Sequence, residues 1–232
     1  MKLAVLGTGF IITDALTAIS EVEGIEKNAI YARPGSEERG EYFAKEYGIK
    51  KVYTDYQEIL KSEDIDTVYV GLINSVHYSY AKEALLAGKN AIVEKPFCPT
   101  YAEAKELSDI AEEKGVFVFD AVTPRHSGVF EKMKELLPKL GEIRSVQGNY
   151  SQYSSRYDNY KNGEVLPAFD PKAYGGALHD LGIYNLNIVV ALLGQPDEVR
   201  YDPNCGQNGV DVSGGLPRAH AYSKDYCEVQ GK

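Results

Sequence analysis

The strongest chemical signal in the sequence is a lysine that directly follows an apolar, strand-like run. Asn90–Val93 is typical of a buried strand, and Glu94-Lys95-Pro96 comes immediately after it. Ligands of parallel sheets bind at the carboxyl ends of the strands, so Lys95 is expected at a ligand-binding edge. Pro96 restricts the backbone of Lys95 to extended conformations, which aims the side chain. A single lysine is usually a surface residue, but this position favours a catalytic role.

A glycine turn near the N-terminus has the composition of a phosphate-binding loop. It separates the strand-like run Lys2–Leu6 from an amphipathic helix that reaches about Ser20. Gly7 permits a tight turn, Gly9 lets the backbone approach a pyrophosphate, and amides at the helix start attract negative charge. The fingerprint departs from the usual Gly or Ala at its sixth position, which is Ile12, and a purely structural turn is the alternative. We expect cofactor contacts from Gly7, Thr8, Gly9, Phe10 and Ile11.

The end of the second strand indicates which dinucleotide is bound. An acidic residue there would bond the ribose 2′-hydroxyl of NAD, whereas an arginine accommodates the 2′-phosphate of NADP. The sequence reads Ile30-Tyr31-Ala32-Arg33, without a carboxylate. We therefore expect NADP, with NAD as the alternative. Arg33 stacked on the adenine would permit either cofactor.

The first 120 residues alternate short apolar runs with helical patterns, which predicts βαβ units around a parallel sheet. Helices are expected over Glu37–Tyr47 and Tyr101–Lys114, because Gly48 and Gly115 are suitable helix ends. The pattern predicts an α/β fold, with a Rossmann-type, doubly wound parallel sheet over residues 1–121. The expected strands are Lys2–Leu6, Asn28–Tyr31, Val52–Tyr53, Thr67–Gly71, Asn90–Val93 and Val116–Phe119.

After Asp120 the pattern changes to that of an α+β domain, which we place at residues 122–232. Helices are expected over Ser127–Leu137 and from about Gly176 to Leu193, with a long strand at Arg144–Tyr153. Ser154–Tyr174 is rich in tyrosine and turn residues. Four tyrosines in and before this stretch either stack on a sugar or cover a cleft or subunit interface: Tyr150, Tyr153, Tyr157 and Tyr160. Further short strands are expected at Val199–Tyr201 and Val210–Val212.

Composition excludes several classes of function. The formal net charge of −9 and the pI of about 5.0 argue against a nucleic-acid partner. We expect no membrane span and no signal peptide. Three scattered cysteines are too few for a disulfide framework or a zinc site, so we expect a cytoplasmic protein without a metal.

Four motifs together resemble the Gfo/Idh/MocA oxidoreductase family. The block Ala87-Gly88-Lys89 through Glu94-Lys95-Pro96 is similar to the family's A-G-K-x-x-x-x-E-K-P, and Gly7-Thr8-Gly9 is similar to its opening turn. Asn74-Ser75-Val76-His77 matches N-x-x-H, and residues 175–184 match G-G-x-L-x-D-x-G-x-[HY]. The resemblance covers residues 1 to about 200. Tyrosine at position 184 is similar to the glucose-fructose oxidoreductase and dihydrodiol dehydrogenase branches.

The resemblance implies an NAD(P)-dependent dehydrogenase or reductase of a sugar, polyol, cyclitol or diol. Lys95 would bond the substrate hydroxyl near the nicotinamide, and Asp180 and Tyr184 would complete the catalytic centre. Positions i and i+4 share one face of a helix, which agrees with this grouping. Tyr184 has an ordinary pKa of ~10 and needs a nearby cation to act at neutral pH, which Lys95 would supply. The alternatives are a packed tyrosine and a helix-start carboxylate.

The remaining site residues are assigned with less specific signals. By the family pattern, Asn74, His77 and Glu94 are expected to contact the cofactor, and Arg125 and His126 follow the sixth strand, where either could reach a substrate hydroxyl. We expect His179 to be structural and Cys98 to be inert.

The sequence also departs from the family, whose members usually continue for roughly 100 further residues. Residues 215–220 have no strand pattern, and the segment ending Cys227–Gly231 is similar to a stretch that lies later in relatives. The chain is a fragment, or pairs its open sheet with a partner, or is a degenerate relative; we expect a homo-oligomer through this sheet. Two other functions stay open: a cofactor-binding regulator without turnover, and a glycosidase or lyase that uses bound NAD transiently.

Overall fold

A computed structural model describes residues 1–216, 218–219 and 227–230 of the chain. The chain divides into two compact units, Met1–Ala121 (unit 1) and Val122–Lys232 (unit 2), and the division falls where the sequence pattern changes. Each unit is described by itself.

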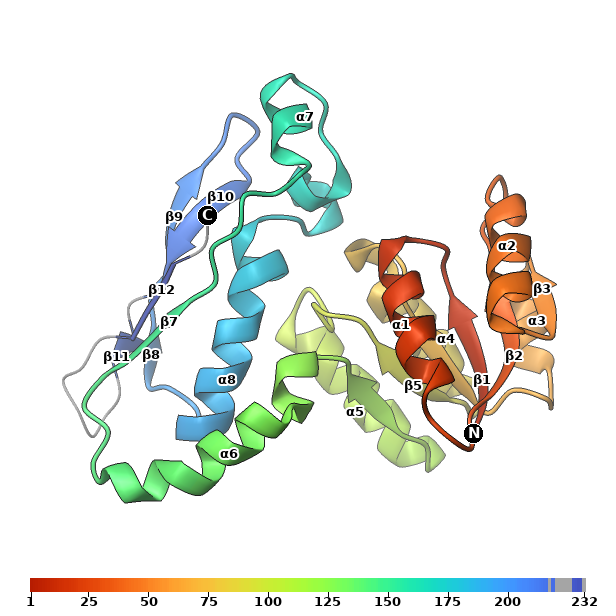
Figure 1. Ribbon diagram of the computed structural model, residues 1–232, viewed down its shortest axis with the longest axis horizontal. Helices are drawn as coiled ribbons and strands as arrows, with labels where there is room; N and C mark the ends of the chain where they lie inside the picture. The colour runs from red at the N-terminus through yellow and green to blue at the C-terminus, as the bar shows by residue number, and fades with distance from the viewer. Residues whose placement is uncertain (217, 220–226, 231–232) are drawn as a thin grey trace. The chain divides into compact units, whose positions relative to one another are not determined.

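Unit 1 is built on six parallel strands in the order β3-β2-β1-β4-β5-β6 (Figure 1). This order reverses direction between β1 and β4, as in doubly wound sheets that bind dinucleotides. The predicted α/β fold is therefore confirmed. The strands are β1 (Lys2–Leu6), β2 (Glu26–Tyr31), β3 (Lys51–Tyr53), β4 (Thr67–Val70), β5 (Asn90–Val93) and β6 (Val118–Asp120).

The helices of unit 1 begin and end at residues suited to those positions. The hydroxyl of Thr100 and the carboxylate of Glu103 form a capping box at the start of one helix, which ends at the left-handed Gly115. A helix that the sequence analysis did not predict starts after Asp55, whose carboxylate accepts the backbone N–H of Gln57 at 2.8 Å. The helices are α1 (Phe10–Ser20), α2 (Glu37–Tyr47), α3 (Tyr56–Lys61), α4 (His77–Leu86) and α5 (Tyr101–Lys114).

The sheet of unit 1 is buried on both faces, which explains why its strands are continuous apolar runs rather than alternating ones. Leu3 and Val5 of β1 pack on one face with α1 and α2, through Ile12, Leu16 and Phe43. Ala4 and Leu6 pack on the other face with α3, α4 and α5, through residues that include Ile59, Ala84, Leu85 and Leu107.

Unit 2 pairs a long helical segment with several short strands. A π-helical turn, η6 (Leu178–Gly182), runs into α8 (Ile183–Leu193), and Val189 of α8 packs with Leu216. Strands pair as β9 with β10 and β8 with β11, both antiparallel, and β7 with β12, parallel. These strands lie along one side of α8 (Figure 1). The further elements are α6 (Gly128–Leu136), β7 (Val146–Asn149), α7 (Tyr157–Lys161), β8 (Glu198–Val199), β9 (Asp202–Cys205), β10 (Asp211–Gly215), β11 (Arg218–Ala219) and β12 (Cys227–Gln230).

Several sequence expectations for unit 2 are wrong in extent. The long strand expected at Arg144–Tyr153 is only the four-residue β7, which pairs with β12, a segment about 80 positions later. The turn-rich stretch Ser154–Tyr174 contains α7. Residues 215–220, expected to lack strands, contain the end of β10 and the short β11. The rest of the unusual C-terminal stretch, 220–226 and 231–232, lies outside the described residues.

The run Pro171–Leu193, which joins the 3-10 turn Pro171–Ala173 to η6 and α8, is more apolar than expected. It has 23 residues and a mean hydropathy of 1.3, enough to cross a membrane by length and composition alone. One such helix is weak evidence for a span, because core helices pass the same criterion. Asp180 lies within it, and Leu178, Leu186 and Val189 belong to a cluster with Val146 and Leu216 of unit 2.

Close contact between two glycines explains the departure from the dinucleotide fingerprint. A Cβ on Gly7 would lie 2.6 Å from the carbonyl oxygen of Gly71, and a Cβ on Gly71 would lie 2.4 Å from Cδ1 of Ile12. The third glycine of the fingerprint normally provides close helix–strand packing. Here Ile12 is fully buried, and the missing side chain of Gly71 at the end of β4 provides the space.

This packing predicts a specific coupling between positions 71 and 12. Gly71→Ala is expected to lower the free energy of unfolding by about 1–3 kcal/mol through overpacking. Ile12→Val removes Cδ1 and alone costs about 0.5–1.5 kcal/mol. In the double variant the two losses should not add, because the valine leaves room for the alanine. Urea denaturation of the four proteins measures this, and strictly additive losses would refute the proposed exchange of space.

Candidate functional site

The turn between β1 and α1 has the geometry of a pyrophosphate cradle. Gly7 adopts φ +114°, which favours glycine, and its N–H donates to the carbonyl oxygen of Tyr31 at 3.0 Å. A Cβ on Gly9 would meet nothing within 4 Å, so the space above this residue is open. Among the described residues no side chain caps the start of α1, and its first turn holds no acid. These amides and the helix dipole therefore suit a bound phosphate group.

The flanking residues of this turn are placed differently from the glycines. Phe10 begins α1 and is 71% exposed, and Ile11 is also exposed. Their backbone amides fit the predicted cofactor contact at the helix start. Thr8 is half-buried beside them.

At the end of β2 an exposed arginine follows a buried aromatic cluster. The ring of Tyr80 packs 4.7 Å from Tyr56, and its hydroxyl lies 3.3 Å from that of Tyr31. Burial, followed by the hydrogen bond with Tyr31, raises the pKa of Tyr80 to about 12, so this hydroxyl stays protonated. Arg33 is exposed two residues after Tyr31. Its assignment to a 2′-phosphate stays a prediction.

The carboxylate nearest in sequence to Arg33, that of Glu37, already accepts hydrogen bonds from backbone N–H groups. Backbone N–H groups of Glu37 and Gly35 donate to the Glu37 carboxylate and hold its pKa below the usual range. The Glu37 carboxylate therefore already occupies backbone amides at the start of α2. A phosphate group bound here would depend on Arg33 rather than on those amides.

Lys95 is half-buried immediately beyond β5, and its backbone is held by a buried carboxylate. Glu94, 8% exposed, accepts the backbone N–H of Lys95 at 3.2 Å. Its other oxygen accepts a short hydrogen bond from the hydroxyl of Tyr69 on β4. The Lys95–Pro96 peptide is cis. The sequence analysis assigned Glu94 to the cofactor, and the structure places both of its oxygens in hydrogen bonds with this part of unit 1.

The two residues taken from the N-x-x-H motif lie at the loop after β4. Asn74 is half-buried and begins a 3-10 turn (Asn74–Val76). His77 is 1% exposed at the start of α4, and both ring nitrogens face backbone carbonyl oxygens, those of Pro96 and Leu72. This burial is at odds with the predicted direct contact between His77 and a cofactor.

Two other residues near this edge have structural roles. Burial raises the pKa of the Cys98 thiol to about 12, which keeps it protonated and agrees with its expected inertness. Lys89 is buried, and its ammonium group donates to the carbonyl oxygens of Ser62 and Ile65 at 2.8 and 2.7 Å. Lys95 is therefore the lysine of this motif that stands at the strand end.

In unit 2, Asp180 lies at the centre of the π-helical turn η6, and Tyr184 is the second residue of α8. Both are half-buried, and π-turns within helices occur frequently at functional sites. The ring of Tyr184 stacks on that of Tyr150 at a centroid distance of 5.2 Å. Regular α-helical spacing, on which the sequence analysis relied, therefore does not hold between positions 180 and 184.

A second carboxylate, half-buried and missed by the sequence analysis, anchors this helix. Asp211 of β10 accepts the backbone N–H of Leu178 at 2.7 Å and a short hydrogen bond from the Tyr201 hydroxyl. Burial and this bond raise the pKa of Tyr201, so its hydroxyl remains a donor. Gly176 has φ +112°, and a Cβ there would lie 1.9 Å from Asp211. An acid between two valines in an apolar run was the available signal for Asp211.

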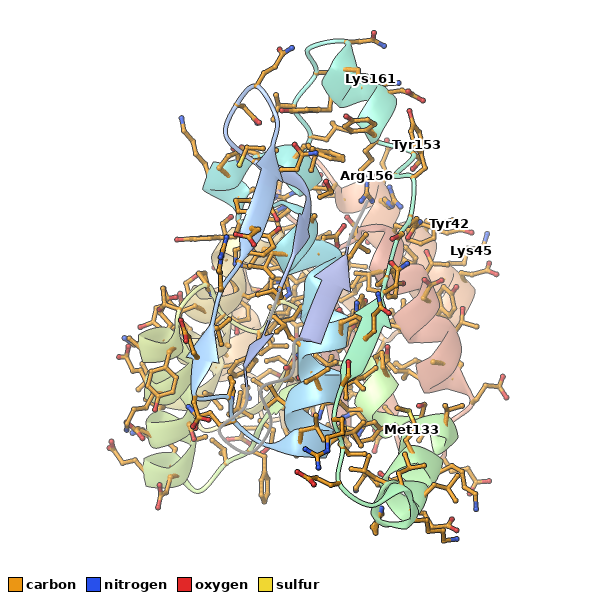
Figure 2. The ribbon with its side chains drawn as sticks, turned by 90° about the vertical axis from the view of Figure 1, so that its left-hand side faces the viewer. Tyr42, Lys45, Met133, Tyr153, Arg156 and Lys161 are labelled. Carbon is orange, nitrogen blue, oxygen red and sulfur yellow. The ribbon has the colours of Figure 1, made fainter. Side chains whose placement is uncertain are left out.

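A cavity of about 280 Å³ lies within unit 2 and includes Asp180 in its wall. Its volume is near the lower end for small-molecule sites. Aromatic rings from α7 and the preceding loop form much of the apolar lining, and Figure 2 shows Tyr153 and Lys161 at this end of unit 2. Further lining residues include Gln152, Ser154, Tyr157, Phe169, Asn204 and Ser213.

The other predicted residues of unit 2 lie outside this lining. Arg125 and His126 are exposed in a 3-10 turn (Thr123–His126) before α6, and their substrate contact stays a prediction. His179 packs edge-on against Tyr174, 6.4 Å between ring centroids, which suits the structural role expected for it. Of the four tyrosines considered for sugar stacking, Tyr153 and Tyr157 line the cavity.

Comparison with known proteins identifies the family of both units. Residues 1–121 match the oxidoreductase family with an NAD-binding Rossmann fold, and residues 130–215 match the Gfo/Idh/MocA C-terminal domain. The chain belongs to the Gfo/Idh/MocA oxidoreductase family. Unit 1 is accordingly the dinucleotide-binding domain of this family, as its strand order and glycine turn indicate.

Relatives include enzymes acting on cyclic polyols and diols. A scyllo-inositol 2-dehydrogenase (NADP+) of Bacillus subtilis is 33% identical over 92% of this chain and 65% of its own length. A trans-1,2-dihydrobenzene-1,2-diol dehydrogenase of Xenopus tropicalis is 29% identical over 91% and 63%. The chain thus spans about two thirds of the length of these relatives.

The fold also matches solved structures. A 3-ketoreductase from Actinomadura kijaniata, in complex with NADP and TDP-benzene, has a TM-score of 0.88, 23% identity, and coverage of 99% of this chain and 69% of its own. At this identity the likeness concerns the Gfo/Idh/MocA fold.

The anchoring role of Asp211 leads to a testable order of stabilities. Asp211→Asn should lower the free energy of unfolding by about 1–3 kcal/mol, because the half-buried N–H of Leu178 and hydroxyl of Tyr201 lose a charged acceptor. Tyr201→Phe should cost less, since Asp211 still accepts the Leu178 N–H. Asp202→Asn, an exposed acid paired with Arg200, is the control and should change stability by less than about 1 kcal/mol. Urea denaturation gives the three values, and a larger loss for Tyr201→Phe would contradict this account.

Proposed function

We propose that this protein is an NADP-dependent oxidoreductase that interconverts hydroxyl and carbonyl groups of small, uncharged, polyhydroxylated ring compounds. The observation that carries the proposal is Lys95 at the end of β5, with its backbone N–H bonded to the buried Glu94. This lysine stands at the carboxyl edge of a dinucleotide-binding sheet, where ligands of such folds bind.

The chain's own residues account for binding and for the proton. A nicotinamide dinucleotide, when bound, supplies the hydride acceptor or donor. The amides of Gly9 and the first residues of α1 hold its pyrophosphate, and the open space above Gly9 admits it. Lys95 donates a hydrogen bond to the reacting oxygen and lowers the cost of charge on it. By their match to the family motif, Tyr184 and Asp180 of unit 2 are assigned to exchange of the hydroxyl proton and to orientation of the substrate.

The cavity of unit 2 supports an uncharged substrate. Among its described lining residues Asp180 is the sole formally charged side chain at neutral pH, and none is Lys, Arg or His. A phosphate or carboxylate buried beside Asp180 would be unpaired and repelled. The lining instead combines aromatic rings with amide and hydroxyl groups, which suit a ring with an apolar face and hydroxyls at its edge.

Two observations bear on the alternative of a regulator without turnover. Ile12 was one reason to consider it, but the space left by Gly71 accommodates this side chain without closing the turn. The backbone N–H of Lys95 donates to Glu94. The helical segment that carries Asp180 is held in a similar way, because the N–H of Leu178 at its start donates to Asp211. Cofactor binding alone does not need such supports, so catalysis is favoured.

The proposed reaction is tested by absorbance of NADPH with a panel of cyclitols, cyclic diols and their phosphate esters. Neutral compounds are expected to turn over and the matched phosphates are not. Lys95→Met should lower kcat by about 10²–10⁴-fold, the range for loss of a group that assists proton transfer. Lys45→Met, an exposed lysine of α2, is the matched control (Figure 2). Equal activity of the Lys95 variant and the parent, or preference for the phosphates, would overturn the proposal.

Cofactor preference is tested separately through Arg33. Arg33→Gln should weaken NADPH binding by about 10–100-fold, as expected for a lost charge-assisted bond, and leave NADH binding nearly unchanged. Fluorescence titration of both nucleotides gives the two constants. Arg39→Gln, on the exposed side of α2, is the control. If both nucleotides weaken equally, Arg33 stacks on the adenine and does not select NADP.

A further inference from the structure

The side chain of His77 bridges two segments of unit 1. At 1% exposure it lies at the start of α4, after the loop that follows β4. Its Nδ1 is 2.9 Å from the carbonyl oxygen of Pro96, and its Nε2 is 3.0 Å from that of Leu72. The ring therefore joins the loop after β4 to the residue that directly follows Lys95.

The chemistry of these contacts limits what His77 can do. Carbonyl oxygens only accept hydrogen bonds, so a neutral imidazole donates to one of them and only the imidazolium donates to both. With both nitrogens directed at backbone, the ring has no atom left to receive a proton from a substrate. Its burial also separates it from any ligand at the surface of the sheet edge.

The opposite side of the same short segment is held by Glu94. Its carboxylate accepts the Lys95 N–H, and Tyr69 of β4 donates to it. The N–H of Lys95 and the carbonyl group of the following residue, Pro96, thus face buried side chains that are held by β4, by its following loop or by α4. Lys95 lies just beyond the last residue of β5, so these contacts fix the backbone where the strand ends.

We propose that His77 is a positioning residue for Lys95, acting through the Pro96 carbonyl, rather than a residue that contacts the cofactor. The proposal rests on the proposed function, in which Lys95 is the catalytic lysine. A displacement of about 1 Å at a reacting group can cost on the order of 100-fold in rate. The bond to Leu72 serves the loop after β4 and is secondary for catalysis.

Two substitutions separate the two bonds. The amide nitrogen of asparagine occupies the place of Nδ1, whereas that of glutamine reaches the place of Nε2. His77→Asn keeps a donor toward Pro96 and should retain kcat within about threefold. His77→Gln keeps only the donor toward Leu72 and should lower kcat by about 10–100-fold, with KM and the NADPH dissociation constant changed by less than about threefold.

A readout independent of turnover distinguishes failure of this proposal from failure of the proposed function. Hydrogen exchange of the Lys95 amide, followed in the whole protein, should accelerate in His77→Gln and stay near the parent in His77→Asn. If the parent turns over no polyol, the proposed function fails, and the exchange rates still decide the positioning role.

Three outcomes would overturn the positioning role. One is a glutamine variant with parental kcat and parental Lys95 exchange. Another is an equal weakening of NADPH binding in both variants, which would indicate direct cofactor contact. The third is an asparagine variant whose kcat falls as far as that of the glutamine variant, because the donor toward Pro96 is then not what supports Lys95.

Discussion

The close approach of the ends of β1 and β4 is the constraint on which the dinucleotide site depends. The two strands meet where the order of the sheet reverses, and there Gly7 lies against the carbonyl group of Gly71. Any side chain on either residue would push the strand ends apart or displace Ile12. Because Ile12 fills the space beside Gly71, α1 packs tightly on the sheet and its first turn remains directed at the open space above Gly9. The geometry of phosphate binding is therefore set by packing beneath the turn as much as by the turn itself.

Most of unit 1 was predictable from the sequence because its structural determinants are local. Parallel strands buried on both faces are short apolar runs, and each helix between them ends near a glycine or begins near a capping residue. Thus Lys2–Leu6, Asn90–Val93 and Tyr101–Lys114 were predicted with the bounds observed. The short α3 was missed, since six residues carry too little periodicity to identify a helix.

Unit 2 was less predictable because its strands depend on partners that are distant in sequence. The run Arg144–Tyr153 has strand-like composition throughout, yet only β7 finds a partner, and that partner is β12. Distance in sequence also explains which residues of the candidate site were predicted and which were missed. The motif led to Lys95, Asp180 and Tyr184, whereas Asp211 and the stacking of Tyr150 on Tyr184 depend on contacts between residues more than 30 positions apart. The π-turn around Asp180 likewise has no simple local signature.

The two units support their functional elements with the same arrangement of groups. In unit 1 a tyrosine hydroxyl and a backbone N–H both donate to Glu94, and the N–H belongs to Lys95. In unit 2 a tyrosine hydroxyl and a backbone N–H both donate to Asp211, and the N–H belongs to the start of the helix that carries Asp180. A carboxylate is a stronger acceptor than a carbonyl group, so it holds a backbone amide more firmly.

The choice of tyrosine as the second donor has a physical consequence. A lysine or arginine would also satisfy a buried carboxylate, but it would place a permanent positive charge beside the catalytic groups. A tyrosine hydroxyl donates without that charge, and the raised pKa of Tyr201 keeps its proton in place. Tyr69 and Tyr201, two of the 18 tyrosines in the chain, thus support elements of the site and need not contact a substrate.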